Sequence, residues 1–276
     1  MGFSSLFFRG IRFLCRPFVK LDARLERRLA QREREKNIKT AKQAERFSYA
    51  NPRDAFFSKI RIITHAGGGL QGMAYLNCKE ALPFYYEKGN RVFEYDVEQK
   101  GERYILAHTD ESNPQGALDG RFTSLGILEC LAFLEAHEDM TVIFDCKFEN
   151  LGAFAAYIKA HAEEGALKRI VIQVFNEKNI LDIRKVYDFK MLHVCMYATD
   201  YLQTVQTCIK HGVGAVSVSV KALNERADWE IFEKNDICVF AYTVNTMEEY
   251  KRLKDKGITG VFSDFLYDTD VENAGA

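Results

Sequence analysis

The sequence predicts an α/β fold, a (β/α)₈ TIM barrel with an N-terminal basic amphipathic helical extension. Two observations predict the barrel: eight short β-branched runs follow one another from residue 60 onward, and helix-like segments separate them. The alternation extends over about 215 residues, which is an ordinary length for a single barrel. A doubly wound open sheet is the competing fold, but such sheets rarely need eight strands.

The predicted strands are short and rich in valine, isoleucine and aromatic residues, as strands usually are. They cover residues 60–64, 92–96, 141–145, 170–175, 192–196, 215–220, 238–243 and 259–263. A further run at 103–107 follows a turn and predicts an extra hairpin strand beside the second one.

Amphipathic segments between the strands predict the outer helices. They cover residues 78–88, 124–137, 150–163, 200–211 and 246–256. Three of them are followed by a glycine, Gly89, Gly212 or Gly257. Glycine is a common helix stop because it adopts left-handed backbone angles without strain.

Charge divides the chain into two predicted domains. Residues 1–46 contain 13 Lys and Arg against 5 Asp and Glu, so they are strongly basic although the whole chain has a net charge of -1. We therefore expect a basic amphipathic helical arm at 1–50 and the TIM barrel at 58–270. Arginines interrupt the apolar stretch of the arm, which argues against a cleaved secretory signal.

Composition excludes several classes of protein. With 21 Phe and 13 Tyr the chain cannot be disordered throughout. It has no uncharged apolar run long enough for a polytopic membrane protein. The 7 cysteines form no CxxC pair, and several lie in apolar runs. They predict reduced core thiols in a reducing compartment and do not support a zinc cluster.

The candidate site residues stand where predicted strands end, which is the catalytic face of a TIM barrel. Glu94 and Asp96 are two residues apart on one strand, so both carboxylates point to the same side. Asp145 ends the next strand and can supply a third oxygen, so one divalent cation, Mg²⁺ or Ca²⁺, is a suitable partner. Solvated acids in ion pairs with lysine or arginine are the alternative interpretation.

Two histidines and a lysine complete the predicted site. His65 follows the first strand and His108 follows the hairpin, where they can act as general base and general acid near neutral pH. Lys147 lies on the same face as Asp145, and it either stabilises charge on a phosphoryl oxygen or pairs with the acids. The glycines at 67–69 form either an anion-binding turn or a plain flexible turn.

These residues resemble the motifs of the glycerophosphodiester phosphodiesterase family, within the phospholipase C-like phosphodiesterase TIM barrels. The family begins with His-Arg-Gly, which the segment at His65 resembles, and Pro-Glu-Asn-Thr, which the segment at Asn77 resembles. Its next motifs are Glu-x-Asp-Val, which resembles Glu94-Tyr95-Asp96-Val97, and a hairpin leading to His-Asp, which resembles the hairpin before His108. Its Glu-x-Lys, Trp-Thr-Val-Asn and Gly-x-x-Thr-Asp resemble Asp145-Cys146-Lys147, Tyr242-Thr243-Val244-Asn245 and Gly260-Val261-Phe262-Ser263-Asp264. The ordered matches cover nearly the whole predicted barrel.

The resemblance implies a metal-dependent phosphoric diester hydrolase that acts on a glycerophosphodiester-like substrate. It implies that His65 and His108 are the catalytic acid and base, and that Lys147 contacts the phosphate. It also implies that one divalent cation, Mg²⁺ or Ca²⁺, is bound by Glu94, Asp96 and Asp145. In this family a neighbouring substrate hydroxyl often attacks first and forms a cyclic phosphate, which water then opens.

Three positions depart from the family pattern. Ala66 stands where the family has an arginine that contacts phosphate, and Leu76 replaces a glutamate. Asp145 is one methylene shorter than the glutamate that it replaces. These changes support an alternative function, a catalytically impaired phosphodiester-binding or scaffolding barrel. Hydrolysis is the favoured hypothesis, because the histidines, the Glu-x-Asp pair and the lysine form one functional unit and are all present.

The expected partner is a small-molecule or lipid-linked phosphodiester substrate, and no nucleic acid is expected. An anionic membrane surface is a second expected partner, because bulky apolar residues recur every three or four positions between Phe3 and Leu29, with basic residues beside them. The reduced cysteines predict a cytoplasmic protein, and the pattern of the arm predicts that it is held peripherally at the inner membrane surface. There are two alternatives: the apolar stripe packs against the barrel or a second subunit, or residues 30–46 form a solvated charged helix.

Overall fold

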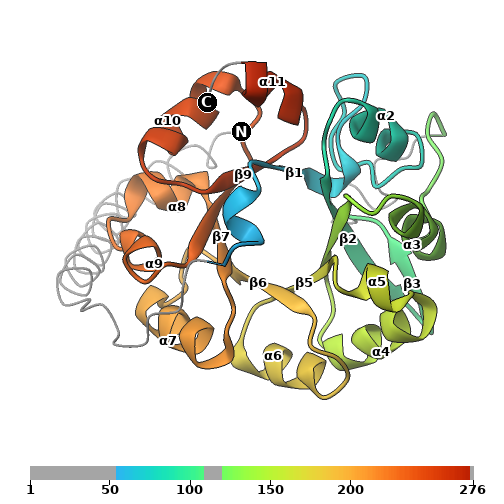
Figure 1. The fold of residues 1–276 in the computed structure, drawn as a ribbon, viewed down its shortest axis with the longest axis horizontal. Coiled ribbons are helices and arrows are strands. Elements are labelled where there is room, and N and C mark those ends of the chain that lie inside the picture. The colour runs from blue at the N-terminus through green and yellow to red at the C-terminus, as the bar shows by residue number, and fades with distance from the viewer. Residues whose placement is uncertain (1–53, 109–119, 274–276) are drawn as a thin grey trace, which may run out of the picture.

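The computed structural model describes residues 54–108 and 120–273, and these residues form the predicted barrel (Figure 1). Eight parallel strands are hydrogen-bonded in the order β1-β9-β8-β7-β6-β5-β4-β2, and pairing of β1 with β2 closes the ring. A ninth strand, β3, pairs antiparallel with the second half of β2 as the predicted hairpin. The strands are β1 Ile62–Thr64, β2 Val92–Lys100, β3 Arg103–Leu106, β4 Thr141–Cys146, β5 Ile170–Val174, β6 Lys190–Cys195, β7 Ala215–Ser219, β8 Cys238–Tyr242 and β9 Gly260–Ser263.

Helices surround the barrel on its outside (Figure 1). They are α2 Ala81–Glu87, α3 Ile127–Ala136, α4 Leu151–His161, α5 Glu164–Leu167, α6 Glu177–Arg184, α7 Tyr201–His211, α8 Val220–Glu225, α9 Glu230–Lys234, α10 Met247–Asp255 and α11 Asp268–Asn273. Two short 3₁₀ helices are η1 Phe57–Lys59 and η2 His65–Gly67. Helices α2, α3, α4, α7 and α10 confirm the predicted segments, and the glycine after α7, Gly212, has the expected left-handed conformation.

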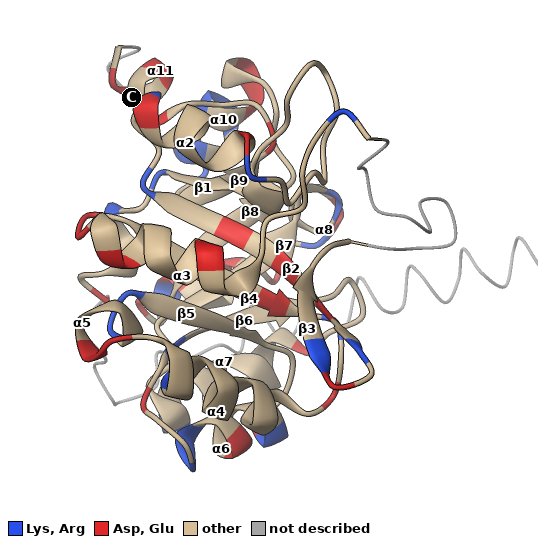
Figure 2. Cartoon of the chain, turned by 90° about the vertical axis from the view of Figure 1, so that its right-hand side faces the viewer, with Lys and Arg blue, Asp and Glu red and all other residues tan. Residues whose placement is uncertain are grey.

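Side chains alternate between two hydrophobic clusters because successive strand residues point to opposite faces. On β2, Val92 belongs to the cluster inside the barrel, whereas Phe93 and Tyr95 belong to the larger cluster under the helices. The next inward positions after Val92 are Glu94 and Asp96, so the interior changes from apolar to acidic along the strand. Figure 2 shows acidic positions, in red, on β2 and at the end of β4. The candidate site therefore lies next to the hydrophobic cluster inside the barrel, at the carboxyl ends of the strands.

The predicted arm at 1–50 lies outside the described residues, so the division into an arm and a barrel stays a prediction. The described part of the chain contains six cysteines, all buried, as expected for core thiols. Within residues 54–108 and 120–273, no helix has both the length and the apolar character needed to cross a bilayer.

Candidate active site

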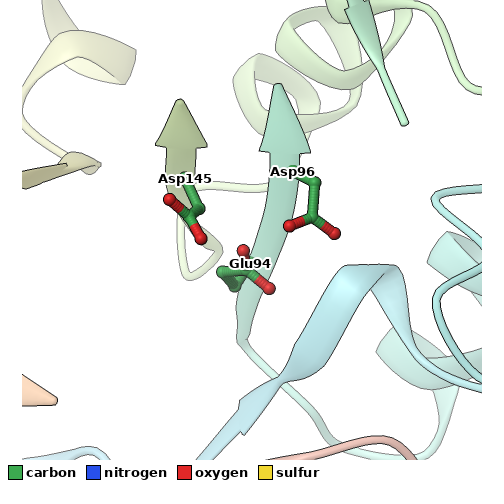
Figure 3. Close-up of side chains that lie close together, drawn as sticks. All are labelled: Glu94, Asp96 and Asp145. Carbon is green, nitrogen blue, oxygen red and sulfur yellow. The ribbon is translucent and has the colours of Figure 1, made fainter. Parts of the chain in front are cut away.

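Three carboxylates meet at the carboxyl ends of β2 and β4. Glu94 and Asp96 lie two residues apart on β2, and Asp96 is paired in register with Asp145 on β4. Figure 3 shows the three side chains turned toward one another, and an oxygen from each lies within 4.8 Å of the other two. Glu94 and Asp96 are each 1% exposed, and the side chain of Asp145 is 14% exposed, so most of the cluster is buried. The structure thus brings together the three residues predicted to bind a metal.

Burial and mutual repulsion oppose full ionisation of this cluster. Burial, followed by the charge of Asp96, raises the pKa of Glu94, and burial also raises the pKa of Asp145. Lys147 neutralises part of the charge, because its Nζ lies 2.9 Å from Oδ1 of Asp96 and pairs with Asp145 as well. Burial lowers the pKa of Lys147, but the charges of these acids outweigh it and raise that pKa above its usual value.

The donor set fits a hard divalent cation. The ammonium group of Lys147 pairs with only two of the three carboxylates, so the cluster lacks positive charge, and Mg²⁺ and Ca²⁺ prefer carboxylate oxygens. Oδ1 of Asp145 is buried without a hydrogen-bond partner in the described part of the chain. A buried carboxylate oxygen with no partner is costly unless a ligand satisfies it, so this atom is available to a cation.

Lys147 adopts the second of its two predicted roles, an ion pair with the acids. Its side chain is nevertheless 35% exposed. A lysine ammonium has three N–H donors, and the two carboxylates use two of them. One donor is therefore left for an oxygen that approaches from the open end of the barrel.

His65 is positioned by the closure of the barrel. It follows β1 directly, and the parallel pairing of β1 with β9 places it beside Asp264, the residue after β9. Nδ1 of His65 donates to Oδ1 of Asp264 across 2.8 Å. Burial lowers the pKa of His65, but the hydrogen bond to Asp264 and the charges of Glu94 and Asp264 outweigh burial and raise the pKa to about 9.

Asp264 is itself fixed by several hydrogen bonds. Asn245 donates from Nδ2 to Oδ2 of Asp264 across 2.8 Å, and its Oδ1 accepts the backbone N–H of Asp264, also at 2.8 Å. The Tyr85 hydroxyl donates to the backbone carbonyl of Asp264 across 2.6 Å. Because the carboxylate is held from both sides, it sets the tautomer and the direction of the His65 ring.

Replacing Asp264 with asparagine should lower the pKa of His65, because the variant loses the negative charge that stabilises the imidazolium. The wild-type pKa is raised, so the variant should release the His65 proton at lower pH than the wild type. The measurement is an NMR titration of histidine-labelled, metal-free protein. Asp255→Asn, an exposed change on α10, is the matched control. The same His65 pKa in Asp264→Asn and wild-type protein would contradict the assignment.

One tyrosine contacts both predicted catalytic histidines. The ring centroid of Tyr75 lies 4.9 Å from that of His65 and 4.8 Å from that of His108. Asn77 ties the same loop to β2, since its Oδ1 accepts the backbone N–H of Asp96 and its Nδ2 donates to Oδ2 of Asp96 at 3.3 Å. The loop between β1 and α2 therefore connects the histidines with the carboxylate cluster.

The glycines after His65 allow close packing, and two of their N–H groups are already used. Gly68 donates to the carbonyl of His65 across 2.8 Å, and Gly69 donates to the carbonyl of Asp264 across 2.7 Å. A Cβ at Gly68 would collide with the ring of Tyr85, and its φ of +95° also requires glycine. These bonds favour a packed turn over the anion-binding turn considered from the sequence.

Sequence reasoning assigned no role in the site to Asp264, Asn245 and Tyr75. A signal for Asp264 existed, because it stands two residues after the inward-facing Phe262, as His65 stands two residues after Ile63. In a closed barrel the first and last strands are neighbours, so these two residues meet. No comparable signal identifies Tyr75, which lies on a loop.

Comparison with known proteins agrees with this architecture. The model of the glycerophosphoryl diester phosphodiesterase family matches residues 133–267. No curated protein sequence matches the chain. The family match confirms the resemblance predicted from the motifs. It begins downstream of both predicted catalytic histidines and of the carboxylates on β2.

Three solved structures share the fold. An Oleispira antarctica phosphodiesterase in complex with the product sn-glycerol-3-phosphate has 17% identity and a TM-score of 0.58, covering 75% of this chain and 93% of that chain. Glycerophosphodiester phosphodiesterases from Thermotoga maritima and Parabacteroides distasonis have 20% and 16% identity and TM-scores of 0.53 and 0.57. Both alignments cover 74% of this chain. They cover 94% of the Thermotoga maritima chain and 92% of the Parabacteroides distasonis chain. At these identities the likeness establishes the TIM barrel.

Proposed function

We propose that this chain, which carries the motifs and the barrel of the glycerophosphodiester phosphodiesterases, hydrolyses a glycerophosphodiester-like substrate with the help of one divalent cation. The observation that carries the proposal is the buried cluster of Glu94, Asp96 and Asp145 beside the hydrogen-bonded His65–Asp264 pair. Acidic ligands and an oriented imidazole at one end of a barrel are suited to phosphodiester chemistry. The glycerol 3-phosphate complex of the Oleispira antarctica protein supports a small phosphodiester as the substrate class.

Each residue has a definite part in the proposed reaction. Glu94, Asp96 and Asp145 would hold Mg²⁺ or Ca²⁺, which supplies stabilisation of negative charge on the phosphoryl oxygens. One of His65 and His108 takes the proton from the attacking hydroxyl, and the other gives a proton to the leaving oxygen. The free donor of the Lys147 ammonium binds a phosphoryl oxygen.

The family arginine and glutamate that this chain lacks are replaced by residues with other contacts. The backbone N–H of Ala66 donates to Oε2 of Glu94 across 2.9 Å, so this position supports a carboxylate of the cluster. Leu76 is 2% exposed and belongs to the hydrophobic cluster outside the barrel. We infer that Lys147 is the principal side-chain cation for the phosphate.

The test is direct. Purified full-length protein is incubated with Mg²⁺ or Ca²⁺ and glycerophosphodiesters that differ in their alcohol, and ³¹P NMR follows the conversion of diester to monoester. Appearance of glycerol 3-phosphate supports hydrolysis. Saturable binding of the diesters without any turnover would contradict hydrolysis and support the alternative, a phosphodiester-binding barrel.

We also propose, from the sequence of residues 1–50, that this segment binds an anionic membrane and places the site near lipid-linked diesters at the inner membrane surface. Each basic residue near such a surface contributes about 1 kcal/mol, and the attraction is screened by salt. Full-length protein should therefore co-sediment with vesicles of anionic phospholipid at low salt and be released at high salt. A chain that begins at Ser48 should stay in the supernatant. Equal sedimentation of both chains would contradict the proposal.

A further inference from the structure

Tyr75 occupies an unusual position in the loop between β1 and α2. Its ring makes an edge-to-face contact with His65, with an interplanar angle of 76°, and a tilted contact of 51° with His108. The side chain is 38% exposed, so it is not a core residue. An aromatic ring that is partly exposed to solvent gains less from burial than a core aromatic does. Its contacts with two histidines therefore call for another explanation.

The backbone at Tyr75 is held in a conformation that its side chain disfavours. Tyr75 has a φ of +58°, and Asn77 has a φ of +45°. Bulky residues rarely adopt such angles, and they do so where the surroundings hold them and often at functional sites. Here Asn77 provides the anchor, because its N–H donates to the carbonyl of Ala66 across 2.8 Å and its side chain binds both the backbone and the carboxylate of Asp96.

The two histidines differ in what else holds them. His65 has a carboxylate partner, since its Nδ1 donates to Asp264. His108 lies two residues beyond the end of β3, and among the described residues Tyr75 makes an aromatic contact with it. Aromatic rings prefer edge-to-face and offset contacts, so the Tyr75 ring restricts how both imidazoles turn. Because one rigid ring makes both contacts, it couples the position of His108 to that of His65.

We propose that Tyr75 is a positioning residue that orients the His65 and His108 imidazoles relative to each other. This inference rests on the proposed function for its catalytic consequence, because acid–base exchange requires both rings to face the same phosphoryl group. The aromatic ring of Tyr75 makes the contacts that orient the histidines, and its hydroxyl is not needed for them. Phenylalanine should therefore replace Tyr75 without loss, and alanine should not.

The structural part of the proposal is tested without any substrate. Full-length protein labelled only in its histidines contains 6 imidazoles, whose NMR signals are assigned by single substitutions. Tyr75→Ala should move the signals of His65 and His108, with the larger change at His108, and leave the other histidines in place. Tyr75→Phe should keep both signals near their wild-type positions. Tyr197→Ala removes another exposed aromatic side chain, 48% exposed and following β6, and should change neither signal.

The kinetic part uses the same variants in the diester assay. Tyr75→Ala should lower kcat by roughly tenfold to a hundredfold with little change in KM, as expected when a reacting group is misplaced. Tyr75→Phe and Tyr197→Ala should keep the wild-type kcat. A Tyr75→Phe variant as impaired as Tyr75→Ala would overturn the proposal, and so would an increase in KM alone or unchanged signals in Tyr75→Ala. A wild-type protein that hydrolyses no diester would refute the proposed function, and the NMR comparison would still decide whether Tyr75 orients the histidines.

Discussion

Replacing either His65 or His108 with alanine is expected to lower kcat for diester hydrolysis by roughly 10²–10⁴-fold, the usual loss for a positioned acid or base. Each variant removes a proton donor or acceptor and leaves the carboxylates of β2 and β4 unchanged. KM should change little, because the imidazoles act on the transition state more than on the bound substrate. The measurement is the initial rate at saturating substrate.

His161→Ala is the matched control for these two variants. His161 is an exposed histidine on α4, and its Nδ1 is hydrogen-bonded to the Tyr157 carbonyl one turn earlier. It should retain the full rate. An unchanged rate in His108→Ala would limit that histidine to a structural role. A loss of rate in His65→Ala supports a catalytic role only if the melting temperature of the variant stays near the wild-type value, because His65 also contacts Asp264.

Removal of divalent metal is expected to abolish hydrolysis, and added Mg²⁺, Mn²⁺ or Ca²⁺ should restore it. The physical reason is the charge of the cluster, because the ammonium of Lys147 does not balance the negative charge of Glu94, Asp96 and Asp145. Without a cation, this negative charge would repel a phosphodiester anion. The measurement is the rate in excess chelator and after stepwise return of metal.

Direct binding gives a second measurement that does not depend on activity. Equilibrium dialysis of the chelator-treated protein should yield one bound divalent ion per chain, and Asp145→Asn should weaken that binding. Asp188→Asn removes a carboxylate that is 86% exposed, and it should bind metal like the wild type. Full hydrolytic activity in excess chelator would contradict the role assigned to the three carboxylates.

The strands were predictable because their signal is local. Runs of β-branched residues and alternating side chains identify a strand without knowledge of its neighbours. Helix α6 is different, since only Ile180 and Ile183 of its apolar residues are buried, and Leu181 is exposed. So short a pattern does not stand out in a sequence, and packing against the barrel stabilises such a helix. The segments α8, α9 and α11 are shorter still.

The candidate site also has a part that the sequence predicts and a part that depends on the tertiary structure. The period of two along a strand was enough to place Glu94 and Asp96 on one face, and the register of β2 with β4 then set Asp145 beside Asp96. The sequence alone left Lys147 with two possible partners. The structure shows it between Asp96 and Asp145, because an ammonium beside two carboxylates is attracted by the charge of both.

By itself the sequence determined the order of the strands, the face that each inward residue occupies and the set of acidic and basic side chains at the strand ends. Only the tertiary structure decided which of these residues touch. Asp264 meets His65 because β9 closes on β1, although 199 positions separate the two residues. Tyr75 meets both histidines because its loop adopts left-handed backbone angles. A tyrosine in the sequence does not predict such angles, since neighbouring hydrogen bonds in the folded chain impose them.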